Sequence, residues 1–262
     1  MTQAPQKDSA MSHDADDKAD LTEPGGKVRL FIDEGLAAGD AVTLNEGQAH
    51  YVRHVMRARA GDRLRLFNGR DGEWSAALAL QGKRGAAAVP ERRTRQQTVA
   101  SDLWLCFAPV KKAPAEFIAQ KATELGVSAL RPIITRRTIV TRVNLERMRA
   151  NAVEAAEQSD RLDVPDCHDP AALPWLLTAW PADRALLFCD EAGAPPILEA
   201  LKSAPPGPWG VLIGPEGGFD PDEREAIRTL QQCVPSTLGS RILRADTAAL
   251  AALAIWQAAL GS

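Results

Sequence analysis

The apolar and polar residues of this chain follow two different periods, and the change from one to the other falls near residue 97. Between Lys27 and Pro90, short runs alternate apolar and polar residues, as in strands that bury one face. After Val99, short apolar runs are separated by longer segments with the spacing of amphipathic helices. The pattern therefore predicts a small all-β domain followed by an α/β domain.

The first domain is predicted to be a small β-barrel with one helix. Residues 68–72, Asn-Gly-Arg-Asp-Gly, lie between two strand patterns and predict a hairpin turn. The helix is expected from Glu46 to Arg57, and the charged run from Glu91 to Gln97 is expected to link the two domains. The expected strands are residues 28–32, 41–44, 63–67, 73–80 and 86–90.

Strands and helices alternate in the second domain, which indicates a mostly parallel sheet enclosed by helices. The expected strands are residues 99–107, 129–134, 185–189, 211–213 and 236–238. The expected helices are residues 113–125, 145–159, 195–202, 222–231 and 247–260. Ligands of such sheets bind beyond the carboxyl ends of the strands, where residues 190–193, 214–219 and 239–244 form the loops.

The stretch VLIGPEGGF, residues 211–219, is the strongest candidate for a ligand site. Its three glycines, Gly214, Gly217 and Gly218, would let the backbone approach a bound molecule, and Pro215 would stiffen the loop. An ordinary strand-to-helix turn has the same composition. A second loop, LGSRILR at residues 238–244, also precedes a helix, and the pair of loops favours a ligand site.

Charge is distributed unevenly along the chain, whose net charge is −3. Residues 1–26 are polar, carry a net charge of −4 and are predicted to form a disordered acidic tail. Residues 27–95 carry +5, and this basic block is the candidate surface for a polyanion. One face of the helix from Glu46 to Arg57 carries His50, Arg53, His54 and Arg57, which suits either phosphate binding or a solvated basic face.

Cysteine usage and hydropathy point to a cytoplasmic protein. The four cysteines are widely spaced, without a CxxC or zinc-like grouping, and are expected to be reduced thiols. There is no apolar run of the roughly 18 residues that a membrane span needs, nor a signal-peptide core. His50 and His54 lack a further carboxylate ligand on their helix beyond Glu46, so no metal is expected.

Four collinear motifs resemble the RsmE family, the bacterial 16S rRNA (uracil-1498-N3)-methyltransferases of the SPOUT superfamily. They are KKAPAEFIAQKATELGV at 111–127, EQSDRLDVP at 157–165, IGPEGGF at 213–219 and LGSRILRADTA at 238–248. The resemblance implies a PUA-like RNA-binding barrel at 27–93 and a SPOUT domain at 98–262 with a deep trefoil knot. It also implies a homodimer that uses S-adenosyl-L-methionine (SAM) to methylate N3 of a uridine in 16S rRNA, within the small ribosomal subunit.

The resemblance also implies which residues form the cofactor site. The cofactor-binding residues would be Leu187, Asp190, Glu191, Gly214, Pro215, Glu216, Gly217, Leu238, Gly239, Arg241, Ile242, Leu243 and Arg244. The RNA-binding residues are predicted from the positions of basic side chains rather than from the resemblance, and they are Arg29, His50, Arg53, His54, Arg57, Arg136 and Arg137. A carboxylate at Glu216 suits a cationic sulfonium better than a phosphate. Asp246 stands where the family commonly has Glu, which favours a role at the helix N-terminus over a longer reach.

The chemistry of uridine N3 defines what the active site must supply. This imide nitrogen is a poor nucleophile until it loses its proton, so the site needs a base or a cation that stabilises charge on O2 and O4. Arg161 and Arg244 are the preferred catalytic cations, and Arg136 and Arg137 are alternatives that would otherwise contact phosphate. Glu157 and Asp246 both remain open as the base.

Other functions fit the sequence less well. A Rossmann-type enzyme would need GxGxxG after the first strand and an acidic residue about 20 positions later, and neither is present. A non-catalytic RNA-binding module would explain the basic first domain but not the two loops. A SPOUT enzyme that methylates a ribose 2′-oxygen or a guanine in tRNA stays an alternative.

Overall fold

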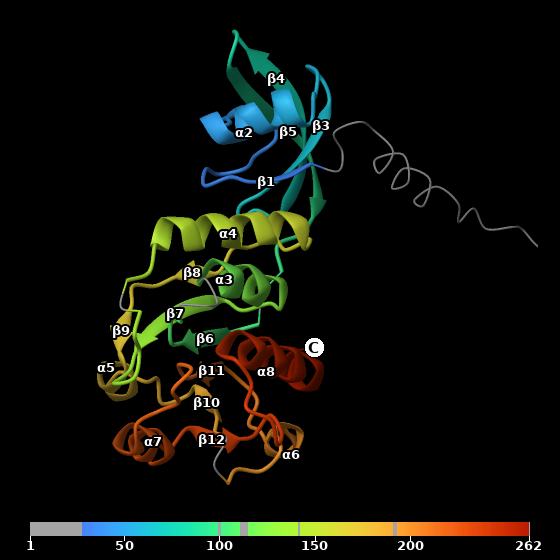
Figure 1. Ribbon diagram of the computed structural model, residues 1–262. Coiled ribbons are helices and arrows are strands. Elements are labelled where there is room, and N and C mark those ends of the chain that lie inside the picture. The colour runs from blue at the N-terminus through green and yellow to red at the C-terminus, as the bar shows by residue number, and fades with distance from the viewer. Residues whose placement is uncertain (1–27, 99–100, 111–114, 141, 191–192, 262) are drawn as a thin grey trace, which may run out of the picture. The chain divides into compact units, whose positions relative to one another are not determined.

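The computed structural model describes residues 28–98, 101–110, 115–140, 142–190 and 193–261 (Figure 1). The chain divides into two compact units, Met1–Gln97 and Thr98–Ser262. The predicted acidic tail lies outside the described residues. No helix in the described ranges is both long and apolar enough to cross a membrane.

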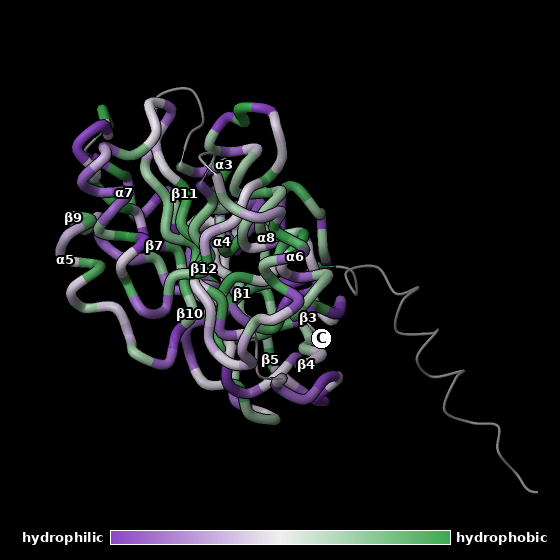
Figure 2. The backbone as a smooth tube through the Cα atoms, turned by 90° about the horizontal axis from the view of Figure 1, so that it is seen from below, coloured by the Kyte–Doolittle hydropathy of each residue, from purple (hydrophilic) through white to green (hydrophobic). Residues whose placement is uncertain are grey.

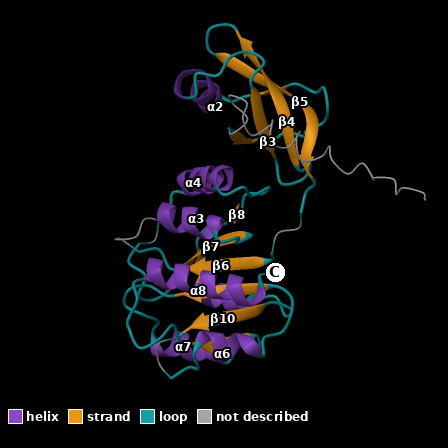
Figure 3. Cartoon of the chain, turned by 90° about the vertical axis from the view of Figure 1, so that its right-hand side faces the viewer, coloured by secondary structure: helices purple, strands orange, loops and turns teal. Residues whose placement is uncertain are grey.

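The first unit is a five-stranded sheet in the order β1-β3-β4-β5-β2, with one helical segment packed against it. Its strands are β1 (Arg29–Phe31), β2 (Val42–Thr43), β3 (Arg63–Phe67), β4 (Glu73–Gln81) and β5 (Gly85–Arg95). β1 runs parallel to β3 and the other pairs are antiparallel. The long strands β4 and β5 bend along their length, which curls the sheet into a half-barrel (Figure 3). Within the described chain β1 and β2 stay at opposite edges, so the sheet is open.

Two predicted boundaries in this unit are wrong. The helix begins at Glu46 behind an Asn45–Gln48 capping box, but α2 (Glu46–His50) continues as the π-helical turn η1 (Tyr51–Val55) and ends before Arg57. Residues 91–95 are not a linker, because β5 extends to Arg95, which pairs with Glu73 of β4. Strand pairing through the backbone overrides the charged composition of this run.

The second unit is built on a parallel sheet in the order β12-β10-β11-β6-β7-β8, and the short β9 also pairs with β7. The strands are β6 (Leu103–Phe107), β7 (Ala129–Ile134), β8 (Asp166–Cys167), β9 (Ala171–Ala172), β10 (Ala185–Cys189), β11 (Trp209–Ile213) and β12 (Cys233–Ser236). The helices are α3 (Ala115–Glu124), α4 (Leu145–Gln158), α5 (Leu173–Thr178), α6 (Ile197–Lys202), α7 (Pro221–Arg228) and α8 (Ala245–Leu260). The predicted α/β class is confirmed.

Alternating strand residues bury their side chains in two cores, one on each face of this sheet. Leu105, Val211 and Leu187 pack with α3, α4, α6 and α8 on one face. Cys106 and Leu212 pack with α5 and α7 on the other. Figure 1 shows α5 and α7 on one side of the sheet and α6 and α8 on the other. Hydrophobic residues follow the central strand β11, as expected for a strand covered on both faces (Figure 2).

Short elements and edge positions account for most differences from the predicted second domain. The sequence pattern missed β8, β9 and α5, which have two, two and six residues. The last strand is Cys233–Ser236 rather than residues 236–238. It contains Pro235, which this strand tolerates because β12 lies at the sheet edge. The trefoil knot stays a prediction.

Candidate functional site

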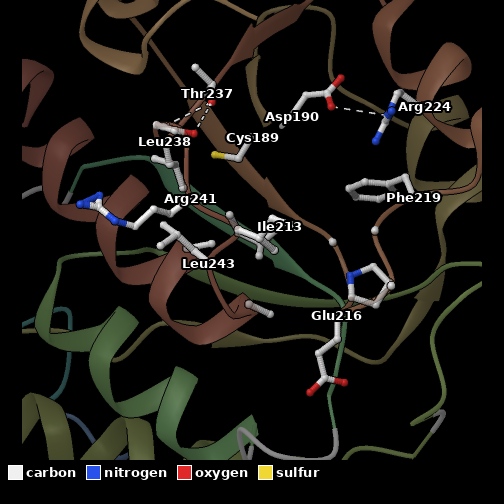
Figure 4. Close-up of a pocket in the computed structure, with 18 residues that line it drawn as sticks. Cys189, Asp190, Ile213, Glu216, Phe219, Arg224, Thr237, Leu238, Arg241 and Leu243 are labelled. Carbon is white, nitrogen blue, oxygen red and sulfur yellow. Dashed lines mark hydrogen bonds and ion pairs between the residues drawn. The ribbon is translucent and has the colours of Figure 1, made fainter. Parts of the chain in front are cut away.

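A pocket of about 230 Å³ lies at the carboxyl ends of β10, β11 and β12, bordered by the start of α8 (Figure 4). This space would hold many water molecules, so it is large enough for an organic ligand. The predicted residues among its walls are Asp190, Gly214, Pro215, Glu216, Gly217, Leu238, Gly239, Arg241, Ile242 and Leu243. The predicted cofactor-binding residues did not include Cys189, Arg224, Thr237, Ala245 and Ala248, and Ile213, Gly218 and Phe219 were predicted only as part of the stretch 211–219.

The loop after β11 is a tight turn anchored by an aromatic side chain. Gly218 N donates to the Pro215 carbonyl over 2.9 Å, and Gly218 adopts φ +67°, which favours glycine. Phe219 is buried and packs edge-to-face on Phe188 with 5.4 Å between ring centroids. A Cβ on Gly214 would lie 2.7 Å from the Phe219 ring. Gly214 is therefore required by its own loop, whatever the ligand.

The loop after β12 leaves its backbone open to the pocket. Gly239 has φ +113°, and no atom lies within 4 Å of where its Cβ would be. The Thr237 hydroxyl contacts both Gly239 N at 3.3 Å and Gly239 O at 3.2 Å. Thr237 N donates to the Pro195 carbonyl, which ties this loop to the segment before α6. The loop thus combines a fixed start with open space beside Gly239.

The side chain of Asp190 links β10 to α7. Its carboxylate is buried and accepts from Arg228 at 2.7 and 2.9 Å, and Arg224 Nε lies 3.4 Å away (Figure 4). Arg224 brings a cation to the pocket wall from the first half of α7, directly after the glycine loop. Glu216 is exposed and extends away from the other labelled side chains in Figure 4. A carboxylate in this position gives little support to the predicted contact with a sulfonium.

Two of the predicted cofactor-binding residues that the structure describes, Leu187 and Arg244, are not on the pocket wall. Leu187 is fully buried in the core of the sheet face that α8 covers, so its side chain supports the wall from behind. Glu191 lies outside the described residues. Arg244 is exposed at the N-cap position of α8, between the pocket residues Leu243 and Ala245.

The other predicted catalytic cation, Arg161, is held by structural partners. Its side chain is 10% exposed. It donates to both carboxylate oxygens of Asp163 at 3.0 and 3.2 Å and to the Thr123 carbonyl of α3 at 2.7 Å. These contacts fix the segment after α4 against α3, and Arg161 is not a pocket residue.

Arg136 and Arg137 contact the protein rather than forming a free basic patch. Arg136 Nη1 lies 2.5 Å from Asp220 and 2.7 Å from Asp222, and its ion pairs with Asp222 and Asp220 raise the Arg136 pKa. Arg137 Nη1 donates to the Gly217 carbonyl over 2.8 Å. Both arginines are therefore attached to the loop that forms one wall of the pocket.

The predicted RNA-binding residues of the first unit fall into three groups: a buried side chain, a side chain bonded to backbone carbonyls, and exposed side chains. Arg29 is 7% exposed, pairs with buried Glu73 at 2.8 Å and stacks on Phe67, and this burial gives its predicted role as a phosphate ligand no support. Arg53 donates to the carbonyls of the β4–β5 turn. The exposed group is His50, His54 and Arg57, with the two imidazole centroids 5.0 Å apart.

The candidate bases lie outside the pocket walls. Asp246 accepts from Thr247 N over 2.7 Å in the first turn of α8, which is the expected role at a helix N-terminus. Glu157 is on α4. Burial raises the pKa of the Cys189 thiol in the pocket wall to about 12, so this group stays protonated. Among the described residues no three His, Cys, Asp or Glu side chains are grouped as metal ligands.

The chemistry of the pocket fits SAM. Ile213, Leu238 and Leu243 supply apolar walls for an adenine ring. The Gly239 carbonyl has a second lone pair besides the one that accepts from the Thr237 hydroxyl, and it can accept a hydrogen bond at the edge of that ring. Arg224 and Arg241 are on the pocket wall, but no Lys-Ser/Thr follows the glycines, as a P-loop for a triphosphate would require.

Known proteins share both units of this chain. The RNA methyltransferase domain family matches residues 97–257, and the RNA methyltransferase PUA domain family matches residues 44–91. Ribosomal RNA small subunit methyltransferase E of Rickettsia conorii is 33% identical, over 86% of this chain and 93% of that protein. The protein of the same name from Bacillus subtilis is 32% identical, over 86% and 94%.

Two solved structures have the same fold across both units. Ribosomal RNA small subunit methyltransferase E from Neisseria gonorrhoeae, bound to S-adenosyl methionine, gives a TM-score of 0.80 at 28% identity, over 89% of this chain and 98% of that one. A methyltransferase from Legionella pneumophila, in complex with SAM, gives 0.79 at 26% identity, over 88% and 97%. The fold, the two matched domains and these relatives together show that the chain belongs to the ribosomal RNA small subunit methyltransferase E family.

Proposed function

We propose that this chain is a SAM-dependent methyltransferase that acts on N3 of a uridine in the rRNA of the small ribosomal subunit. The observation that carries the proposal is the pocket formed by two glycine-containing loops at the carboxyl ends of β11 and β12. Relatives with the same fold bind SAM, and relatives of similar length are named for the rRNA of the small subunit.

The pocket residues have three tasks in this reaction. Ile213, Leu238 and Leu243 enclose the adenosine part of SAM and exclude water from it. The peptide groups of the two loops orient the cofactor, which supplies an electrophilic methyl group on a sulfonium when bound. Fixed alignment of the two reacting atoms is the main catalytic contribution, because methyl transfer is an in-line displacement.

Charge on the uridine ring is the second requirement. Loss of the N3 proton to solvent leaves negative charge shared by N3, O2 and O4, and a guanidinium that donates to one of the two oxygens can stabilise this charge while N3 stays open to the methyl carbon. Arg244 suits this role because it is exposed next to the pocket residues Leu243 and Ala245. Arg161 would have to leave Asp163 and the Thr123 carbonyl to take part. The chain thus offers a cation at the pocket more readily than a base.

We assign RNA contacts in the first unit to His50, His54 and Arg57, the predicted residues whose side chains are exposed. Arg53 braces the β4–β5 turn and would contribute mainly its positive charge. Contacts of this kind hold phosphates without reading the sequence, so the choice of nucleotide rests with the second unit.

The oligomeric state, the trefoil knot and the cellular location are part of the same proposal. The family resemblance supports a homodimer and a trefoil knot, and a substrate in the small ribosomal subunit places the protein in the cytoplasm. Sedimentation equilibrium at micromolar concentration tests the dimer, for which a mass of twice 28.2 kDa is expected. A mass of one chain would contradict it.

The reaction is tested with the purified full chain, small ribosomal subunits that lack the modification, and SAM with an isotopically labelled methyl group. We expect the label in 3-methyluridine after the rRNA is digested to nucleosides. Label in a 2′-O-methylated nucleoside would assign the alternative ribose chemistry. No transfer to any nucleoside would contradict the proposed activity.

A further inference from the structure

The turn that follows β7 contacts the pocket loop but does not line the pocket. Thr135 N and the Thr135 hydroxyl each lie 2.9 Å from the Thr138 hydroxyl, and Thr138 N donates to the Thr135 carbonyl. These bonds close a compact turn and leave Arg136 and Arg137 at its exposed tip. The turn is 80 positions from Gly217 in the sequence, yet it meets the glycine loop.

Arg137 contacts the middle of that loop. Its Nη1 donates to the Gly217 carbonyl over 2.8 Å. A Cβ on Gly217 would meet the aliphatic part of the Arg137 side chain at 3.7 Å, so this side chain lies directly against the glycine. The hydrogen bond within the loop joins Gly218 N to Pro215 O, which leaves the Gly217 carbonyl for Arg137.

Arg136 holds the end of the same loop by separate bonds. Its backbone N donates to Glu223 Oε1 over 2.8 Å, and Glu223 Oε2 accepts from Asp220 N over 3.2 Å. Glu223 is 7% exposed and completes the capping box of α7. The turn at residues 135–138 is thereby fixed to the start of α7, and this contact keeps Arg137 next to Gly217.

We propose that Arg137 is a positioning residue for the cofactor. Its hydrogen bond holds the peptide group at Gly217 in one orientation and so determines the shape of the pocket wall. The inference rests on the proposed function, since it assigns a role in SAM binding. Gly217 has no side chain that could limit its own backbone rotation. The Gly217–Gly218 peptide is therefore held by two hydrogen bonds, one within the loop from Gly218 N to the Pro215 carbonyl and one from Arg137 to the Gly217 carbonyl.

This assignment replaces the predicted role of Arg137 as a free RNA ligand. A guanidinium bonded to a carbonyl keeps its full charge, because a carbonyl is not a counter-ion. Arg137 can thus hold the loop and still attract the polyanionic substrate. Replacement of Arg137 should therefore weaken the affinity for the cofactor. A residue that only contacted RNA phosphate would leave this affinity unchanged.

The test compares SAM affinity by titration calorimetry in the full-length wild type, Arg137→Ala, Arg137→Lys and Arg70→Ala. Arg70 is the matched control, because it is also exposed and donates to one backbone carbonyl, Asp33 O, over 2.7 Å in the other unit. We expect Arg137→Ala to raise the SAM Kd about fivefold to tenfold, as for loss of one charge-assisted hydrogen bond. Arg137→Lys should recover most of the affinity, and Arg70→Ala should change it less than twofold.

Amide hydrogen exchange shows whether the effect acts through the loop. Arg137→Ala should speed exchange at the amides of residues 214 and 216–218 while the melting temperature stays within a few degrees of the wild type. A SAM Kd within twofold of the wild type in Arg137→Ala would overturn the inference and leave the proposed function intact. Failure of the wild type itself to bind SAM would overturn both.

Discussion

Replacement of Gly214 by alanine should destabilise the second unit through a single aromatic ring. The new methyl carbon would lie 2.7 Å from Phe219 Cε2, 3.0 Å from Cδ2 and 3.2 Å from Cζ. Phe219 is 6% exposed and packed on Phe188, so it can move only by disturbing the core. Overpacking of this kind costs about 1–3 kcal/mol of unfolding free energy.

A double-mutant cycle isolates that contact. Phe219→Ala alone should cost about 3–5 kcal/mol, because it removes a buried aromatic side chain. In the Phe219→Ala background the added methyl at residue 214 meets no ring, so Gly214→Ala should then cost nearly nothing. Urea unfolding of the four proteins, followed by tryptophan fluorescence, gives each free energy.

The reasoning is refuted if Gly214→Ala costs the same with and without the Phe219 ring. Equal costs would mean that the glycine serves backbone geometry or another neighbour. A coupling of 1 kcal/mol or more would assign Gly214 to the packing of its own loop. The glycine would then be explained without reference to the cofactor.

Three further perturbations test other parts of the structure. Glu73→Ala removes the buried carboxylate that pairs with Arg29 and should cost about 3–5 kcal/mol in urea unfolding. Arg63→Ala, at a half-exposed ion pair, should cost under about 1 kcal/mol, and similar losses would contradict this difference. The described thiols have pKa values raised to about 11 or 12 by burial, so Ellman's reagent at pH 8 should react slowly with the native protein, and a rapid phase would show an accessible thiolate. Arg57→Glu should weaken binding of small-subunit rRNA and make its salt dependence shallower, whereas the same charge change at exposed Lys202 on α6 should not; equal effects would move the RNA surface away from the first unit.

The regular elements of the fold followed from the sequence pattern where turn residues mark their ends. β3, β7 and β10 have the predicted bounds. Gly61 precedes the first of them and Gly126 the second, and both glycines adopt positive φ. The pattern missed β8 and β9, because two residues are too few to show a period.

The pocket could be predicted because its walls are consecutive residues in two loops with glycine and apolar signals. The nearest omission, Thr237, directly adjoins the predicted stretch 238–244. Arg224 lies in the first half of α7, the helix that follows the first loop, and this closeness to the glycine loop could have indicated a pocket residue. Its ion pair with Asp190 joins residues 34 positions apart, which local spacing does not reveal.

The roles of the arginines could not be predicted from local sequence. Charge patterning treats each one as an exposed cation, but partners far along the chain decide where it points. Arg29 pairs with Glu73, 44 positions away, and Arg161 donates to a carbonyl 38 positions away. Such partners become visible only when the two units have folded, so the predicted basic surface was too large.

The central claim is methylation of uridine N3 in the rRNA of the small subunit, and its most direct test is made in cells. Deletion of the gene for this chain in the organism that encodes it should remove one 3-methyluridine from 16S rRNA, as measured by mass spectrometry of mapped fragments. A plasmid copy of the wild-type gene should restore it. Persistence of every 3-methyluridine in the deletion strain would contradict the account.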